Sequence, residues 1–227
     1  MTFKPLLVAC ITALGCLSAQ AATSVLTGFT VNYDDTTTFG GIGFTFGDGT
    51  NEGFGFNVPT TVQVVSDGTG LVTASFALPS FTITANTGYQ LSGLTGFLGN
   101  LVFNELRSTS SSSASATAAL SVDGTPLGSF GGVMTRTVTS TVGTLISGYH
   151  VGNTTAPLPA YNTLTVSGGV LTLSATSTNG FASIIAQPQN ELSFSTVVTA
   201  VPEPETLALM LSGLAVLGTL TKRRRQH

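Results

Sequence analysis

Cysteine and tryptophan are nearly missing from this chain of 227 residues: tryptophan is absent, and the two cysteines, Cys10 and Cys16, lie in an apolar N-terminal segment. If that segment is removed as a leader peptide, the mature protein contains no cysteine. Disulfide bonds, a thiol nucleophile and a thiolate metal site are then excluded. The absence of tryptophan also removes the largest flat aromatic side chain on which a sugar ring can stack.

Basic residues are nearly missing from the region between residues 22 and 200, which we call the body. It contains Arg107 and Arg136 against eight acidic residues, a net charge of −6, and no lysine. Such a surface cannot neutralise a phosphate backbone, so the composition excludes nucleic-acid binding. Serine, threonine, asparagine and glycine must cover the body instead, which suits an extracellular matrix. The body is long enough for one domain with its own core.

The N-terminal end has the three parts of a secretory signal peptide. Lys4 supplies the positive charge, Leu6–Leu17 form an apolar run of 12 residues, and Ala19-Gln20-Ala21 is a small-x-small cleavage site. The run is too short to span a bilayer as a helix, which takes about 20 residues. We therefore predict a signal peptide at 1–21, cut after Ala21 by signal peptidase. The alternative is a lipoprotein signal that uses one of the two cysteines.

The C-terminal end combines a rigid spacer, an apolar run and a basic cluster. Pro202 and Pro204 keep the backbone extended and out of a helix, which is the shape that a membrane-embedded protease can bind. The apolar run that follows has about 16 residues. As a helix it would measure ~24 Å, against a hydrocarbon core of about 30 Å. The cluster holds its end in the cytoplasm and leaves the body outside. The cytoplasmic anchor consists of Lys222, Arg223, Arg224 and Arg225.

This arrangement resembles the PEP-CTERM sorting signal of Gram-negative bacteria, with Gly213 and Gly218 in the apolar run and one departure, Glu205, where the family usually has serine or alanine. The resemblance implies cleavage near the motif by an exosortase, in species that make exopolysaccharide or floc matrix. We expect residues 201–227 to be this signal, with a transient transmembrane helix. The alternative is an ordinary membrane anchor that is never cut. The sorting motif is Val201, Pro202, Glu203 and Pro204.

The body alternates apolar and polar residues with a period of two and has no sustained helical pattern. Segments rich in β-branched and aromatic residues, separated by glycine-containing turns, predict short strands. The fold class predicted for 22–200 is all-β, a single antiparallel β-sandwich or jelly roll. The predicted strands are Thr60–Ser66, Leu71–Phe76, Phe81–Ala85, Leu164–Ser167, Val170–Thr176 and Leu192–Val198. The predicted turns are Asp67-Gly68, Asp123-Gly124, Ser167-Gly-Gly169 and Asn179-Gly180.

Two segments of the body are less regular. Ser108–Ala119 is a Ser/Ala/Thr run that we expect to be a loop entering a strand near Ala116, with a flat strand as the alternative. Phe81–Gly99 is similar to a strand–turn–strand unit of PEP-CTERM ectodomains, in which Ala-x-x-Gly-Tyr leads into the second strand. That similarity implies a β-sandwich and names no ligand.

Phenylalanines interleaved with glycine stand between residues 39 and 56. Four of them share the parity of their numbers, and we expect these four to pack in the core between two sheets, with a binding groove as the alternative. The segment contains Phe39, and the four are Phe44, Phe46, Phe54 and Phe56.

The body does not supply a catalytic set. Its histidine, His150, stands in a predicted turn with no carboxylate nearby in sequence, and no Gly-x-Ser-x-Gly elbow is present. Asp34 and Asp35 are adjacent, so on a strand they would point to opposite faces rather than form the carboxylate pair of a glycosidase. We predict no catalytic residue and no enzymatic activity.

We predict no cofactor, and calcium is the alternative, because hard oxygen ligands stand near glycines. Asp48–Gly53 is similar to the start of an EF-hand loop, but Pro59 occupies the twelfth position, where glutamate is needed. Gly40–Thr45 is similar to a calcium-binding nonapeptide with threonine in place of aspartate. Ordinary turn chemistry also explains both segments. The candidate ligands are Asp34, Asp35, Asp48 and Glu52.

The function that these features predict is that of an exported cell-surface or extracellular-matrix protein, non-enzymatic and associated with exopolysaccharide. Its partners would be signal peptidase, an exosortase, the membrane before processing, and a polysaccharide. Two alternatives are a carbohydrate-binding module and a secreted hydrolase. The aromatic platforms of such a module would be Tyr33, Tyr89, Tyr149 and Tyr161.

Overall fold

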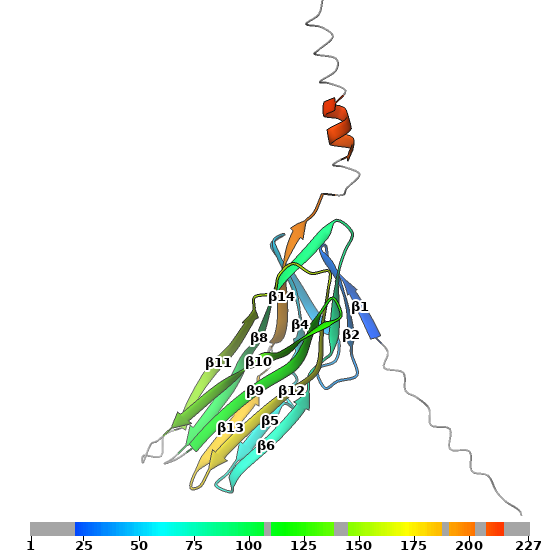
Figure 1. Ribbon diagram of the computed structural model, residues 1–227. Helices are drawn as coiled ribbons and strands as arrows, with labels where there is room; N and C mark the ends of the chain where they lie inside the picture. The colour runs from blue at the N-terminus through cyan, green and yellow to red at the C-terminus, as the bar shows by residue number, and fades with distance from the viewer. Residues whose placement is uncertain (1–20, 107–109, 139–144, 188–190, 203–207, 216–227) are drawn as a thin grey trace, which may run out of the picture.

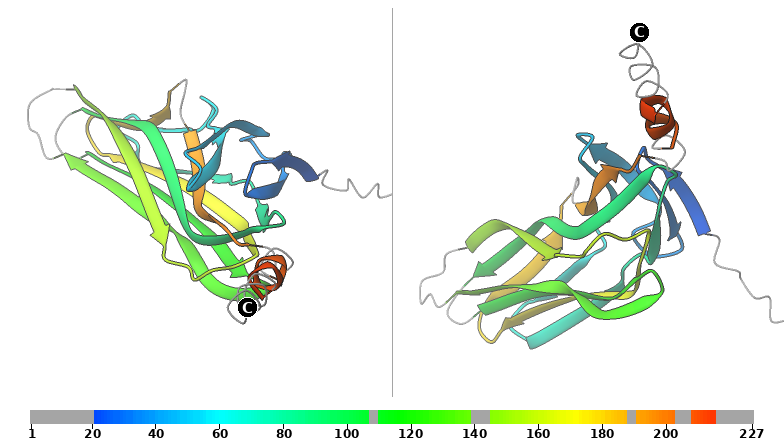
Figure 2. Two further views of the ribbon diagram at one scale, coloured as in Figure 1. Left: turned by 90° about the horizontal axis from the view of Figure 1, so that it is seen from above. Right: turned by 45° about the horizontal axis from the view of Figure 1, so that its top comes forward.

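The computed structural model describes residues 21–106, 110–138, 145–187, 191–202 and 208–215. These residues form fourteen strands and one short helix. The strands make two antiparallel sheets that lie face to face (Figures 1 and 2). The predicted all-β sandwich is therefore confirmed.

The first sheet has the strand order β1-β2-β7-β12-β9-β10, with β6 also paired to β12. Long β12 pairs with β7 along its first residues and with β6 along its last, while β9 lies along its other side. The strands are β1 Ala21–Val25, β2 Phe29–Asp34, β6 Gly70–Ala77, β7 Phe81–Ala85, β9 Ser110–Val122, β10 Thr125–Val138 and β12 Thr163–Ser177.

The second sheet has the order β3-β4-β14-β8-β13-β5, with β11 also paired to β8. Its centre is β8, which pairs with β14 and then β13 on one side and with β11 on the other. The strands are β3 Ile42–Gly47, β4 Asn51–Asn57, β5 Gln63–Ser66, β8 Tyr89–Leu106, β11 Leu145–Ala156, β13 Phe181–Ala186 and β14 Glu191–Ala200.

Aromatic rings fill the upper part of the space between the sheets. The ring of Phe54 lies 5.1 Å from Phe81 of the opposite sheet, and the Phe81 ring lies 4.6 Å from Phe194. Along β12 the burial alternates residue by residue, as a sheet with one buried face and one wet face requires. Burial of this apolar face is the main force that holds the sheets together.

Two sequence expectations for the first sheet are wrong. Ser167-Gly-Gly169 is not a turn: Leu164–Ser167 and Val170–Thr176 belong to one strand, and the register shift between Ser167 and Val170 is a bulge around Gly168, whose φ is +60°. Ser110–Val122 is a strand rather than mostly a loop, because β10 and β12 pair with it along both edges. Hydrogen bonding from two neighbours overrides the weak strand propensity of serine and alanine.

The expectation that four phenylalanines share the core is half right. Phe54 and Phe56 are fully buried, but Phe46 is 44% exposed and Phe44 is only half-buried. After the register shift between Ile42 and Phe44, the hairpin of β3 and β4 pairs even-numbered with odd-numbered residues, as in Phe46 with Gly53. Directly paired residues project from the same face. Equal parity therefore puts the β3 phenylalanines on the outer face and those of β4 in the core.

The helix at 208–215 follows the last strand and is drawn beyond the end of the sandwich (Figure 1). Its apolar side chains are exposed, Leu209 at 73% and Leu211 at 65%. Within the described part of the chain, no helix is both long and apolar enough to cross a membrane.

Candidate functional site

The sandwich ends where the predicted sorting motif begins. The amide of Val201 donates to the carbonyl of Gly88 at 2.8 Å, and among the described residues no later backbone hydrogen bond to the sheet follows it. Val201 and Pro202 are exposed and outside any strand or helix. Glu203 and Pro204 lie outside the described residues, as does the basic cluster at 222–225. The start of the motif is thus accessible at the surface.

The predicted signal-peptide cleavage site meets the first strand. Ala19 lies outside the described residues, whereas Ala21 is the first residue of β1 and pairs with Asp34 of β2. Cleavage after Ala21 would therefore remove one residue from β1 and leave its other pairs intact.

The aspartates among the calcium candidates serve as turn acceptors. Asp34 accepts hydrogen bonds from the amide and the hydroxyl of Thr36, and the hydroxyl bond lowers the pKa of this exposed carboxyl most. Asp48 accepts from the amides of Asn51 and Thr50 at 2.8 and 2.9 Å, and these two bonds lower its pKa, that of Asn51 first. Both are the local hydrogen bonds by which aspartate stabilises turns.

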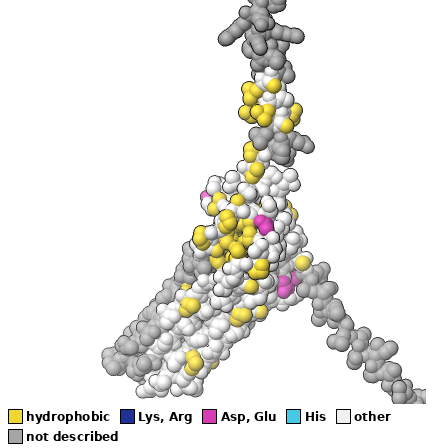
Figure 3. Space-filling model, in the orientation of Figure 1, with side chains coloured by type: hydrophobic (Ala, Val, Ile, Leu, Met, Phe, Trp, Pro, Cys, Tyr) yellow, Lys and Arg dark blue, Asp and Glu magenta, His cyan; other side chains and the backbone are white. Residues whose placement is uncertain are grey.

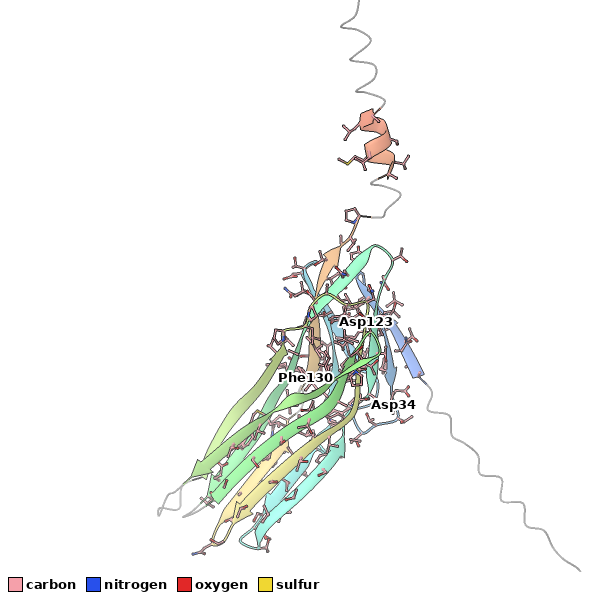
Figure 4. All side chains as sticks on the ribbon, viewed as in Figure 1. Asp34, Asp123 and Phe130 are labelled. Atoms are coloured by element: carbon pink, nitrogen blue, oxygen red, sulfur yellow. The ribbon has the colours of Figure 1, made fainter. Side chains whose placement is uncertain are left out.

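The other two calcium candidates are separated by their burial. Asp35 is exposed, whereas Glu52 is only 7% exposed and accepts the amide hydrogen of Gly28 at 2.9 Å. In the described ranges, no three His, Cys, Asp or Glu side chains come together as metal ligands. Figure 4 places Asp34 well apart from Asp123, which accepts the amides of Asn162 and Thr163. Asp34, Asp48, Glu52 and Asp123 thus each accept a hydrogen bond from the chain itself.

One of the four tyrosines named as platforms for a sugar, Tyr161, lies in the core. Tyr161 is 1% exposed, and its hydroxyl donates to the carbonyl of Gly93 at 2.9 Å and lies 2.8 Å from the hydroxyl of Thr196. Burial raises the pKa of Tyr161 to about 12. Tyr33 packs edge-on against Phe56 at 5.8 Å. Tyr161 is therefore a core residue, and its assignment as a platform is wrong.

The other residues named from the sequence are less informative. Tyr89 is half-buried at the start of β8. Tyr149 and His150 belong to β11, opposite Val102 and Leu101, so the prediction that His150 stands in a turn is wrong. The side chains of Tyr149 and His150 lie outside the described set.

The outer face of the second sheet holds a shallow trough, and two of the phenylalanines that the sequence offered for a binding groove line it. Its described lining comes from β3, β8 and β14 and includes Phe44, Phe46, Phe97, Glu191, Ser193 and Ser195. The signal in the sequence is the Phe-x-Phe of β3 facing the Gly-x-Gly of β4, a pattern in which aromatic rings cover glycines of the adjacent strand. Recognising it requires the hairpin register, which the sequence analysis did not derive.

A second hollow, of about 280 Å³, lies between the sheets where β9 and β10 face β8 and β14. Phe130, labelled in Figure 4, lines it together with Leu98, Met134 and Phe194. None of its described lining residues is charged. On the face drawn in Figure 3, hydrophobic side chains gather in the upper part of the sandwich, towards the C-terminal helix, and few acidic ones are visible. Thr117 is the one polar side chain among its described lining residues, so the hollow is largely apolar.

Comparison with known proteins identifies one end of the chain. No curated protein matches this chain. Among solved structures, "Structure of infectious bursal disease virus Gx strain" matches at 16% identity over 70% of this chain, with a TM-score of 0.21, too low to support any argument. This chain covers 43% of that one. The family model of the PEP-CTERM protein-sorting motif matches residues 200–225. This match includes the predicted motif and the basic cluster, and it implies export, cell-surface sorting in bacteria and processing by an exosortase. The chain is therefore a PEP-CTERM motif-containing protein.

Proposed function

We propose that this protein leaves the cytoplasm of a Gram-negative bacterium by its signal peptide at 1–21 and is held briefly in the inner membrane by its C-terminal segment. Signal peptidase and an exosortase then release it to the cell surface or the extracellular matrix. The observation that carries the proposal is the sorting motif at 200–225. The exposed, extended chain at Val201 and Pro202 supports it, because a protease can bind that segment without unfolding the sandwich.

We further propose that the mature protein acts by being displayed, without catalysis, in association with exopolysaccharide. Its body has no cysteine to act as a thiol nucleophile, one histidine, and no Gly-x-Ser-x-Gly elbow to present a nucleophilic serine. Its surface is polar but carries little charge, which allows it to lie within a hydrated, uncharged matrix without ionic repulsion.

The test is a double substitution, Pro202→Ala with Pro204→Ala, expressed in the native host. Two alanines permit a helix through the motif and remove the extended shape, so the full-length chain should accumulate in the membrane fraction. Glu205→Ser is the matched control, because it changes the departure from the family pattern and leaves both prolines in place. Mass spectrometry of each chain reads both processing sites. Identical processing and placement of the double variant and the control would contradict the proposal.

A further inference from the structure

The trough on the outer face of the second sheet is built by pairing phenylalanine with glycine across strands. Phe44 of β3 lies opposite Gly55 of β4, which in turn lies opposite Ser193 of β14. Ser193 lies opposite Phe97 of β8. Directly paired residues of an antiparallel ladder project from one face. This row therefore presents a ring, a gap, a hydroxyl and a second ring across four strands.

The next row places Phe46 opposite Gly53, with Ser195 beyond the glycine. Both rings lean across β4, because a Cβ atom on either opposing glycine would overlap the ring that faces it. The two rings are stacked, with centroids 6.1 Å apart and planes inclined by 27°. Since Phe46 is 44% exposed, Phe44 and Phe46 form an aromatic platform that solvent can reach.

The floor beside this platform carries hydroxyl groups. Ser193 and Ser195 of β14 line it, and Phe97 of β8 closes its far side. Neighbouring strands are about 4.8 Å apart, so the backbones of β4 and β8 lie roughly 10 Å apart on either side of β14. Glu191 stands at one end, where its side chain and that of Phe97 both lie over Gly99.

We infer that this trough binds an uncharged glycan chain. The rings offer apolar faces to the C–H face of a sugar, and the serine hydroxyls and the Glu191 carboxylate offer hydrogen bonds to its hydroxyls. No lysine, arginine or histidine is among the described residues that line the trough, and its one charge is negative. A polyuronate or sulfated chain would be repelled. The inference rests on the proposed function, because a glycan meets this face only after export.

The polar floor favours a glycan over a protein partner. An apolar protein side chain seated on Phe44 and Phe46 would cover the hydroxyls of Ser193 and Ser195 without giving them hydrogen bonds, and each buried group left unpaired lowers affinity. A sugar can place its C–H face on the rings and hydrogen-bond to the serine hydroxyls at the same time. A second copy of this chain is the competing occupant.

The test measures retardation of the mature protein, purified from its host, in native gels containing hydroxyethyl cellulose, dextran or alginate, and its binding to an array of uncharged glycans. Retardation or array binding with a neutral glycan is expected, with none in alginate. Phe46→Ala and Phe97→Ala should each weaken binding about tenfold, as expected when an aromatic contact is lost. Leu71→Ala is the matched control, because Leu71 is 68% exposed on the outer face of the other sheet.

A further variant, Gly55→Ala, keeps every lining residue but forces the Phe44 ring to move, so it should also weaken binding. Melting temperatures verify that each variant is folded. The inference is overturned if no neutral glycan binds, if the phenylalanine variants bind as the control does, or if they change only the oligomeric state. Phe46→Ala should be exported and processed normally. Failure of wild-type export would instead refute the proposed function.

Discussion

The buried hydroxyl of Tyr161 makes two contributions to stability that depend differently on pH. At neutral pH it donates to the Gly93 carbonyl at 2.9 Å. Tyr161→Phe removes that bond, but the Thr196 hydroxyl also lies 3.0 Å from the same carbonyl, which therefore keeps a donor. The expected loss is that of one net hydrogen bond, about 1 kcal/mol in the free energy of unfolding.

At alkaline pH the effect of Tyr161→Phe on the free energy of unfolding changes sign. Burial raises the pKa of Tyr161 from 10.0 to about 12, so the unfolded chain loses this proton before the folded chain does. The stability that this group contributes is complete below pH 10 and is lost as the pH rises towards 12. Two pH units correspond to about 2.7 kcal/mol. A phenylalanine has no proton to lose, so the variant is spared this decline.

Urea unfolding followed by circular dichroism between pH 7 and pH 12 tests both effects. Tyr161→Phe should be about 1 kcal/mol less stable than the wild type at pH 7 and about 1 kcal/mol more stable near pH 12. Tyr89→Phe, at a half-buried position, controls for the general loss of a phenol. A difference between wild type and Tyr161→Phe that stays constant over this range would refute the placement of Tyr161 in the core.

Three further outcomes are expected. Glu52→Ala leaves the buried amide of Gly28 without its acceptor and should lower the free energy of unfolding by about 1–3 kcal/mol in urea, with Glu52→Gln less damaging; equal losses would argue against the bond. The lowered pKa values of Asp34 and Asp48 make their stabilisation complete above the ordinary value of 3.8 and lost as the pH falls below it. Replacing both by alanine should reduce the decline of the melting temperature at acid pH. An unchanged decline would contradict the hydrogen bonds that the two aspartates accept in their turns. Gly53→Ala brings a methyl group to 2.6 Å from a backbone oxygen of β14 and should lower the melting temperature further than a control alanine at Gly41, where an added Cβ would lie 3.5 Å from the Tyr33 hydroxyl.

Much of the fold was predictable because strand patterns are local. Phe81–Ala85 was predicted with the bounds that the structure has, and the Asp123-Gly124 turn was predicted from its two residues, both of which adopt positive φ. The bulge at Gly168 and the strand at Ser110–Val122 were not predictable in this way, because each is stabilised by pairing with strands distant in sequence.

The candidate sites likewise depend on contacts between residues that are distant in the sequence. The tyrosines were named by residue type alone, and tertiary packing decided that Tyr161 lies in the core. The sequence offered a groove at Phe44 and Phe46 but could not supply the serines of the trough, because these are about 100 to 150 residues from its phenylalanines in the chain and meet them only through strand pairing. No local pattern specifies which strand becomes the neighbour of another.

The sequence by itself determined the sorting motif and the all-β class. The motif acts through contiguous residues whose backbone restriction and charge need no partner, and strand alternation is a property of each segment. Only the tertiary structure decided which aromatic residues face solvent. The face on which Phe44 and Phe46 project depends on the register of β3 against β4, and a shift of one residue would have put both rings in the core.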